Sequence, residues 1–366
     1  MLSKYIRIFI GGLAIFMIVE AGALIYIDRG FLKESDSFQV QKIQNNVSSS
    51  NASIKVRFSS SAEDAKASYD GKFLAYTDDD QLNILNMSTG KQTKISMDED
   101  MELDYYKWLY DRDQLIIAET NTGGKSYYAK LYNLNAKELS GSNAAQEIRN
   151  TVDNQPAKIT LKSKYSHITD MDFSTSTVMT YLKITEKGDS TIWKFNIPDE
   201  NKAFTSLKTK DIGNIQCLKN ESVVLYEDKE NGKIYIAGGS NIKSDGQEKL
   251  ALIGFDNDDK LYLAENDGSG SAKTLLYGSI LKQGDDGDST VDTTPELTKL
   301  SLDNTVKIKN IHITLKGGIF EQDVQNHTFK NLITNKETSY SGDVLTFYGS
   351  GFITLKDGIV HAVKLD

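Results

Sequence analysis

The residue types that most often carry catalysis or bind metal ions are sparse in this sequence. Its four histidines are His167, His312, His327 and His361, and no two have the spacing of a metal site on one helix or strand. His312 and His361 lie in apolar runs, so we expect them in the core or lining a channel. The single cysteine, Cys217, can form neither an internal disulfide nor a zinc site by itself. We therefore expect no cofactor.

Two acidic segments offer candidate cation ligands. Asp256–Asp259 begins like a calcium-binding EF-hand loop, but Leu261 takes the place of the required glycine and Glu265 comes two positions too early. This segment is therefore predicted to be a hairpin turn. Weak candidates for loose calcium binding are Asp285, Asp286 and Asp288.

Aromatic residues gather between positions 105 and 132 of the chain, which holds 18 tyrosines in all. Tyr105, Tyr106 and Trp108 are candidates for binding a partner, because tyrosine and tryptophan give large contact areas at low entropic cost. The alternative is that these rings pack inside the fold.

The elements that must position these residues are short strands joined by turns. Ser68–Tyr76 reads as a tight Asp-Gly turn followed by a strand, because glycine accepts a positive φ without strain. A second strand, Gln81–Asn86, follows, and degenerate copies of the unit recur about every 45 residues, near the length of a four-stranded blade. We predict an all-β, closed β-propeller of about seven blades, with six or eight as alternatives.

The chain ends of this ring are predicted to meet. The last copy of the repeat supplies three strands, and a strand over Ser53–Phe58 precedes the first copy without an obvious partner. Joining them closes the ring and removes two open sheet edges. Closure predicts that deletion of residues 53–58 lowers the thermal stability. Insertions interrupt the repeats around 140–157, where Asn143–Ile148 could form a short helix, and around 283–297, which reads as a mobile loop.

The phrase Ser68–Tyr76, SYDGKFLAY, resembles the repeated phrase of TolB-type and dipeptidyl-peptidase-type propellers, which are WD40-like β-propeller repeats. It departs from them at Tyr69, where those repeats usually have proline. The resemblance implies a fold and not an activity. Some propellers of this kind carry a serine peptidase domain, but the sequence has no Gly-x-Ser-x-Gly motif, so we do not expect a peptidase.

The segment before the propeller is apolar enough to cross a membrane. Residues 5–27 hold about 20 apolar residues, the length needed to span a bilayer, and we expect an uncleaved anchor rather than a signal peptide. The predicted organisation is a cytoplasmic tail (1–4), a transmembrane helix (5–27), a linker (28–52) and a β-propeller domain (53–366). Glu20 is unusual within such a span and is a candidate contact with a partner helix.

Composition limits the classes of function. The net charge of −9 argues against nucleic acid as a partner, and abundant Asn, Lys, Asp, Ser and Ile suggest a bacterial protein. A slight excess of positive charge before the span places the large domain outside the cytoplasm. We expect a non-catalytic, single-pass membrane protein whose propeller is a protein-interaction or sensor module at the cell envelope. The alternatives are a propeller enzyme acting on glycans or peptidoglycan, which needs converging carboxylates, and a structural subunit of a larger membrane complex.

Overall fold

The computed structural model describes residues 58–59, 61–98, 100–121, 123–140, 157–195, 202–203, 207–243, 249–283 and 289–365. This part of the chain is built from β-strands, with two short 3₁₀ helices, η1 (Ala136–Ser140) and η2 (Ile308–Asn310). Within it, no helix has the length and apolar character needed to cross a membrane. The predicted span, the linker and the possible helix at 143–148 all lie outside the described residues.

The strands form seven successive antiparallel sheets, which we number as blades 1 to 7. Blade 1 contains β1 (Ala62–Ala67), β2 (Phe73–Asp78), β3 (Gln81–Asn86) and β4 (Gln92–Lys94). Blade 2 contains β5 (Glu102–Trp108), β6 (Gln114–Asn121), β7 (Tyr128–Asn135) and β8 (Ala157–Thr160). Blade 3 contains β9 (Ser166–Ser174), β10 (Met179–Glu186), β11 (Asp189–Phe195) and β12 (Lys202–Ala203). Blade 4 contains β13 (Ile212–Cys217), β14 (Val224–Asp228) and β15 (Lys233–Ile236).

The remaining three blades follow the same plan. Blade 5 contains β16 (Leu250–Phe255), β17 (Lys260–Asn266), β18 (Ser271–Ser279) and β21 (Thr298–Lys307). A separate hairpin, β19 (Leu281–Gln283) and β20 (Ser289–Val291), is inserted between its last two strands. Blade 6 contains β22 (Ile311–Ile313), β23 (Ile319–Asp323), β24 (Thr328–Asn331) and β25 (Glu337–Ser339). Blade 7 contains β26 (Asp343–Tyr348), β27 (Gly351–Lys356) and β28 (Ile359–Lys364).

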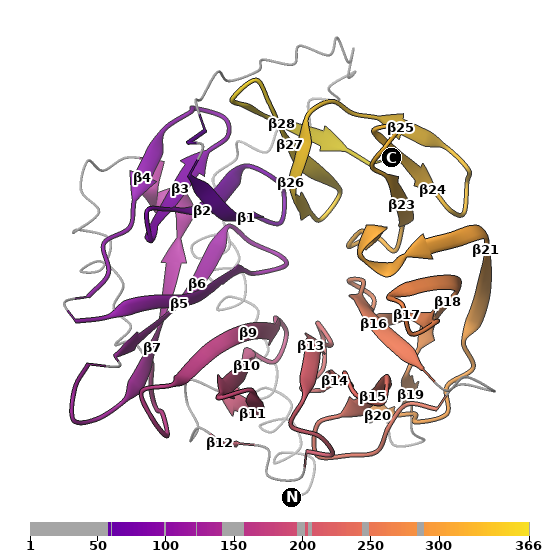
Figure 1. Ribbon diagram of the computed structural model, residues 1–366, viewed down its shortest axis with the longest axis horizontal. Helices are drawn as coiled ribbons and strands as arrows, with labels where there is room; N and C mark the ends of the chain where they lie inside the picture. Colours follow the sequence, from indigo (N-terminus) through magenta and orange to yellow (C-terminus); the bar gives the residue numbers. More distant parts are fainter. Residues whose placement is uncertain are drawn as a thin grey trace, which may run out of the picture. The chain divides into compact units, whose positions relative to one another are not determined.

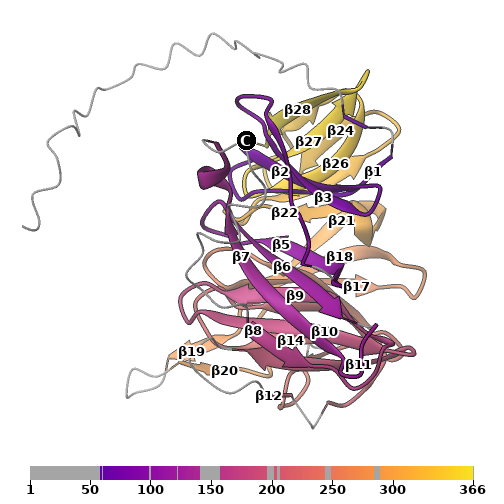
Figure 2. The same cartoon turned by 90° about the vertical axis from the view of Figure 1, so that its left-hand side faces the viewer.

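The blades are arranged around a central axis, with the first strand of each blade nearest to it (Figure 1). Figure 2 shows the ring from the side, with strands of blades 2 and 3 facing the viewer. The all-β prediction and the count of seven blades are confirmed. This architecture places the turns between strands on the two faces of the ring.

The Asp-Gly turn of blade 1 forms as the sequence predicts. Gly71 has a φ of +74°, and its N–H donates to the carbonyl of Ser68 at 3.0 Å. The Asp70 carboxylate accepts hydrogen bonds from the Ser68 hydroxyl (3.2 Å) and the Lys72 N–H (3.0 Å). The turn joins β1 to β2. The strand β1 itself carries no sequence signal, because AEDAKA lacks apolar alternation.

Equivalent turns of neighbouring blades are linked directly to one another by hydrogen bonds. The Gly349 N–H donates to the Tyr69 carbonyl (3.0 Å), and the Leu315 N–H donates to the Gly349 carbonyl (2.9 Å). The Asn257 N–H donates to the Leu315 carbonyl (2.9 Å), and the Asn220 side-chain amide donates to the Asn257 carbonyl (3.2 Å). This turn belt joins blades 1, 7, 6, 5 and 4 on one face of the ring.

The apolar core is divided among the seven interfaces between blades. Each interface has its own buried cluster, from Phe73 and Trp108 between blades 1 and 2 to Phe329 and Phe352 between blades 6 and 7. Burial of apolar surface is the main stabilising contribution in a fold of this kind. Its stability is therefore spread around the circumference rather than concentrated at the centre.

The ring closes between blades 7 and 1. Val360 of β28 packs in one buried cluster with Tyr76 of β2 and with Phe58, which precedes β1. The Phe58 N–H also donates to the carbonyl of Gly358 at 3.1 Å. Residues 53–57, the rest of the predicted closing strand, lie outside the described residues.

Candidate functional site

The three aromatic candidates divide between two interfaces. Tyr106 and Trp108 are 1% and 5% exposed, respectively, and pack between blades 1 and 2. The Trp108 indole N–H donates to the carbonyl of Lys66 at 2.8 Å. Tyr105 is half-buried and faces blade 3, where its hydroxyl donates to Asp170 at 3.1 Å. The structure thus places these rings in the packing between blades, and they do not form an exposed aromatic face.

The other candidates offer no metal site in the described part of the chain. Glu20, Asp285, Asp286 and Asp288 lie outside the described residues, and the described ones hold no cluster of three or more potential metal ligands. His312 is half-buried and stacks on Phe347, with ring centroids 3.7 Å apart. Burial lowers the pKa of His312 to about 4, so this ring is neutral at physiological pH.

Carboxylates on the inner strands of blades 2 and 3 reach across to the next blade. The first strand of each blade is an edge strand, so every second N–H lacks a partner in its own sheet. Asp104 accepts a hydrogen bond from the Ile168 N–H at 2.7 Å. Asp172 accepts from the Cys217 N–H at 2.6 Å. Asp170 accepts from the Ile215 N–H at 3.4 Å. These three carboxylates therefore connect blades 2, 3 and 4 by hydrogen bonds.

Asp172 is also the centre of a buried group of charges. Its carboxylate lies 2.8 Å from Nζ of Lys107 and accepts a hydrogen bond from the Tyr110 hydroxyl. A second ammonium group, that of Lys219, lies 3.2 Å from the centroid of the Tyr110 ring. Burial alone would raise the pKa of Asp172, but the charges of Lys107 and Lys219 hold it below its usual range. Burial lowers the pKa of Lys219 to about 8.

These inner carboxylates therefore have a structural role. Each is occupied by a backbone amide of the next blade, and Asp172 is in addition compensated by Lys107. Asp172, whose pKa is held below its usual range, is a poor general acid, whereas burial raises the pKa of Asp104. The groups of this cluster are thus engaged with one another, and the exposed hollows of the molecule lie on the faces of the ring.

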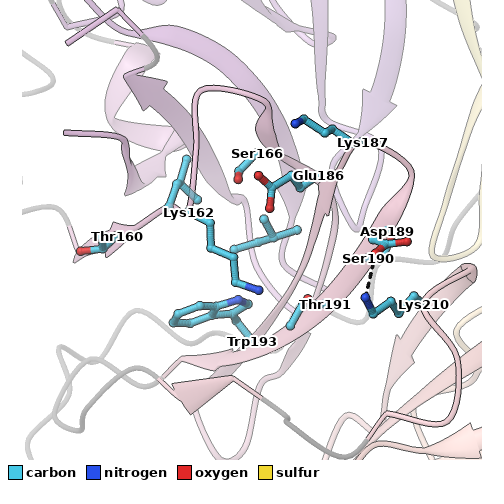
Figure 3. Close-up of a pocket in the computed structure, with 12 residues that line it drawn as sticks. Thr160, Lys162, Ser166, Glu186, Lys187, Asp189, Ser190, Thr191, Trp193 and Lys210 are labelled. Carbon is cyan, nitrogen blue, oxygen red and sulfur yellow. Dashed lines mark hydrogen bonds and ion pairs between the residues drawn. The ribbon is translucent and has the colours of Figure 1, made fainter. Parts of the chain in front are cut away.

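A pocket of about 370 Å³ opens at blade 3 (Figure 3). It is formed where the hairpin between β10 and β11 meets two loops, one before β9 and the other before β13. The lining residues are Thr160, Leu161, Lys162, Ser166, Ile184, Glu186, Lys187, Asp189, Ser190, Thr191, Trp193 and Lys210. This volume is at the lower end of the range of small-molecule sites, which is about 300–1,000 Å³.

The local structure fixes the polar groups of this pocket. Lys187 and Gly188 have positive φ values of 52° and 95°, so they form a two-residue turn that makes Glu186 and Asp189 direct cross-strand partners. Asp189 pairs with Lys210 across a distance of 2.9 Å. The Glu186 carboxylate accepts a hydrogen bond from the hydroxyl of Ser163.

Sequence reasoning missed this pocket. The only local signal is the Glu-Lys-Gly-Asp segment, which is typical of a tight hairpin. Nothing in the sequence shows that Thr160 and Lys210, fifty positions apart, line the same hollow as that hairpin. Such a site depends on the packing of loops that only the closed ring brings together.

Comparison with known proteins supports the fold. No family model matches the chain, and no curated protein matches it significantly. The β-propeller domain of Cps50 (Swd1) from Myceliophteria thermophila is similar over 84% of this chain and 98% of that one, at 10% identity and a TM-score of 0.52. Virginiamycin B lyase from Staphylococcus aureus is similar over 84% of this chain and 95% of its own, at 13% identity and a TM-score of 0.50. At such identities the likeness shows the fold alone: the chain is a seven-bladed β-propeller.

Proposed function

We propose that this protein is a non-catalytic interaction module, tethered to a membrane by residues 5–27 and carrying its propeller outside the cytoplasm. The observation that carries the proposal is the engagement of the inner carboxylates, since Asp104, Asp170 and Asp172 each bind an amide of the next blade. A ring cross-linked in this way is a rigid support for the loops on its two faces. Propellers commonly serve as scaffolds for protein partners.

The tether and the location rest on the sequence. About 20 apolar residues within 5–27 match the thickness of a bilayer. The linker over 28–52 has a polar composition and is long enough to hold the propeller away from the lipid surface.

The location can be tested with one introduced cysteine. Val324 is 54% exposed, whereas Cys217, the single native cysteine, is fully buried. We expect a Val324→Cys variant in intact cells to react with a membrane-impermeant maleimide, and the wild type to stay unlabelled. Labelling that requires permeabilised cells would place the propeller in the cytoplasm and overturn this part of the proposal.

The interaction role is tested by copurification of the full chain from detergent. We expect a second membrane protein to copurify with the wild-type chain in a fixed stoichiometric ratio. This partner should be absent when the Glu20→Leu variant is purified, because a carboxylate within a span is costly unless a partner helix satisfies it. An unchanged set of partners would exclude the contact through Glu20. If no protein copurifies in a fixed ratio, the result would argue against the interaction module. If a large assembly copurifies, the result would favour the structural-subunit alternative.

One observation favours the enzymatic alternative. Glu186 and Asp189 are cross-strand partners that line the same pocket, and paired carboxylates are what glycan hydrolysis requires. Against it, the side chain of Asp189 is 64% exposed and already pairs with Lys210. Hydrolysis of peptidoglycan or glycan substrates by the wild type, abolished in Glu186→Gln, would replace the non-catalytic proposal with this one.

A further inference from the structure

The blade 3 pocket combines one aromatic side chain with an even mixture of hydrogen-bonding groups. Trp193 is half-buried and is the only aromatic residue that lines it. Lysine ammonium groups donate hydrogen bonds, carboxylates accept them, and hydroxyl groups do both. All three kinds line this pocket: Lys162 and Lys187 donate, Glu186 accepts, and Thr191 can do either.

Trp193 is held in place by the sheet and not by a loop. On β11 it pairs with Leu182 of β10 on one side and Ala203 of β12 on the other. Its ring also packs against the apolar cluster between blades 2 and 3. The sheet fixes the backbone of Trp193 and the cluster holds its ring, so little entropy is lost when a ligand binds.

The charges at the pocket largely cancel. Lys210 and Asp189 neutralise one another at 2.9 Å, and the other charged residues of the lining are Glu186, Lys162 and Lys187. An anionic ligand would meet two carboxylates here, and a cation would meet three ammonium groups. The lining is thus suited to a neutral ligand that both donates and accepts hydrogen bonds at many points.

We propose that this pocket binds a short neutral saccharide. A pyranose ring has a face of C–H groups, which can cover the Trp193 indole, and an edge of hydroxyl groups, each able to donate and accept. Glu186 accepts from two neighbouring hydroxyls, while Lys162 and Thr191 supply the matching donors. The inference goes beyond the proposed interaction role and does not rest on it, because a saccharide site is compatible with a protein partner bound elsewhere on the ring.

The test is titration calorimetry of the full chain in detergent with two neutral probes, chitotriose and maltotriose. We expect at least one to bind, and Trp193→Ala to weaken that binding about tenfold or more, as truncation of an aromatic anchor does. Trp193→Phe should stay within about threefold of the wild type, because it keeps an aromatic face. As a matched control, Ile333→Ala removes a side chain that is 52% exposed on blade 6 and should leave binding unchanged.

Two further readouts make the result decisive. The chain has two tryptophans, and Trp108 is buried between blades 1 and 2, so a change of emission on titration reports on Trp193. Binding of a neutral saccharide should also be the same at about 0.05 and about 0.5 M salt, since no net charge is screened. The proposal is overturned if neither probe binds at about 10 mM, beyond the range expected of a specific site. It is also overturned if a folded Trp193→Ala variant binds like the wild type, or if an acidic peptide such as tetraglutamate binds instead in a salt-sensitive way.

Discussion

Replacement of Lys219 by methionine is the sharpest test of the electrostatics inside the ring. Lys219 is 3% exposed and lies in the turn after β13, where its ammonium group stands 3.2 Å from the centroid of the Tyr110 ring. Burial lowers its pKa from 10.5 to about 8, although the nearby carboxylate of Asp172 acts in the opposite direction. The folded protein therefore holds this proton less tightly than the unfolded chain does.

The size of the effect follows from that difference. At about 1.4 kcal/mol for each pH unit between 10.5 and about 8, the charged Lys219 costs the folded protein about 3 kcal/mol. We expect Lys219→Met to remove this cost and to raise the free energy of unfolding by up to about 3 kcal/mol at neutral pH. Because the unfolded chain loses the same proton at higher pH, the gain should be complete below about pH 8 and disappear as the pH approaches 10.5.

The assay is denaturation of the full chain in guanidinium at about pH 7, 8, 9 and 10, with the wild type and Lys219→Met side by side. Lys356→Met, which changes an exposed lysine, is the control and should show no pH-dependent difference. Lower stability of Lys219→Met at pH 7 would mean that Asp172 and Tyr110 compensate the buried charge fully, and the reasoning would fail. A gain of the same size at every pH would assign the effect to apolar packing instead.

Three other substitutions test separate parts of the fold. Asp172→Asn should lower the free energy of unfolding by about 3–5 kcal/mol in denaturant titrations, because it leaves buried lysines without their counter-charge. Asp113→Asn should raise the melting temperature at pH 7 but not at pH 4, since burial and the charge of Asp70 raise the pKa of Asp113 and stability is lost as the pH rises through it. Gly351→Ala should prevent folding, as judged by circular dichroism, because its Cβ would lie 2.0 Å from the carbonyl oxygen of Val363.

The architecture was largely predictable because its signals are local. Short apolar alternations and turn residues such as Asp70-Gly71 repeat at the length of a blade, and neither depends on distant contacts. The strand β1 escaped prediction because a blade can tolerate a polar inner strand whose neighbours supply the apolar contacts. The segment around 283–297, predicted to be a mobile loop, includes β20 of the inserted hairpin.

The side-chain roles were not predictable for a physical reason. Asp172 is one polar residue among many in the sequence, and its importance comes from a cysteine amide 45 positions away and a lysine 65 positions away. Tyr105 and Tyr106 are an exception, because side chains alternate between the two faces of a strand and adjacent rings must therefore lie on opposite faces. The pocket at Trp193 is still less visible, since it depends on how two loops meet a hairpin.

Ring closure has a consequence for how this chain is made. The contact between Phe58 and Gly358 joins positions about 300 residues apart, so it cannot form until almost the whole propeller has been synthesised. At about 5–20 residues per second this takes about 15–60 s. Throughout that time the apolar side chains of blade 1 that pack against blade 7, Leu74 and Tyr76 among them, lack their partners from blade 7. The nascent protein is thus an open, incomplete ring that exposes apolar side chains on blade 1. Correct folding requires that these side chains be shielded from other molecules until blade 7 has been synthesised.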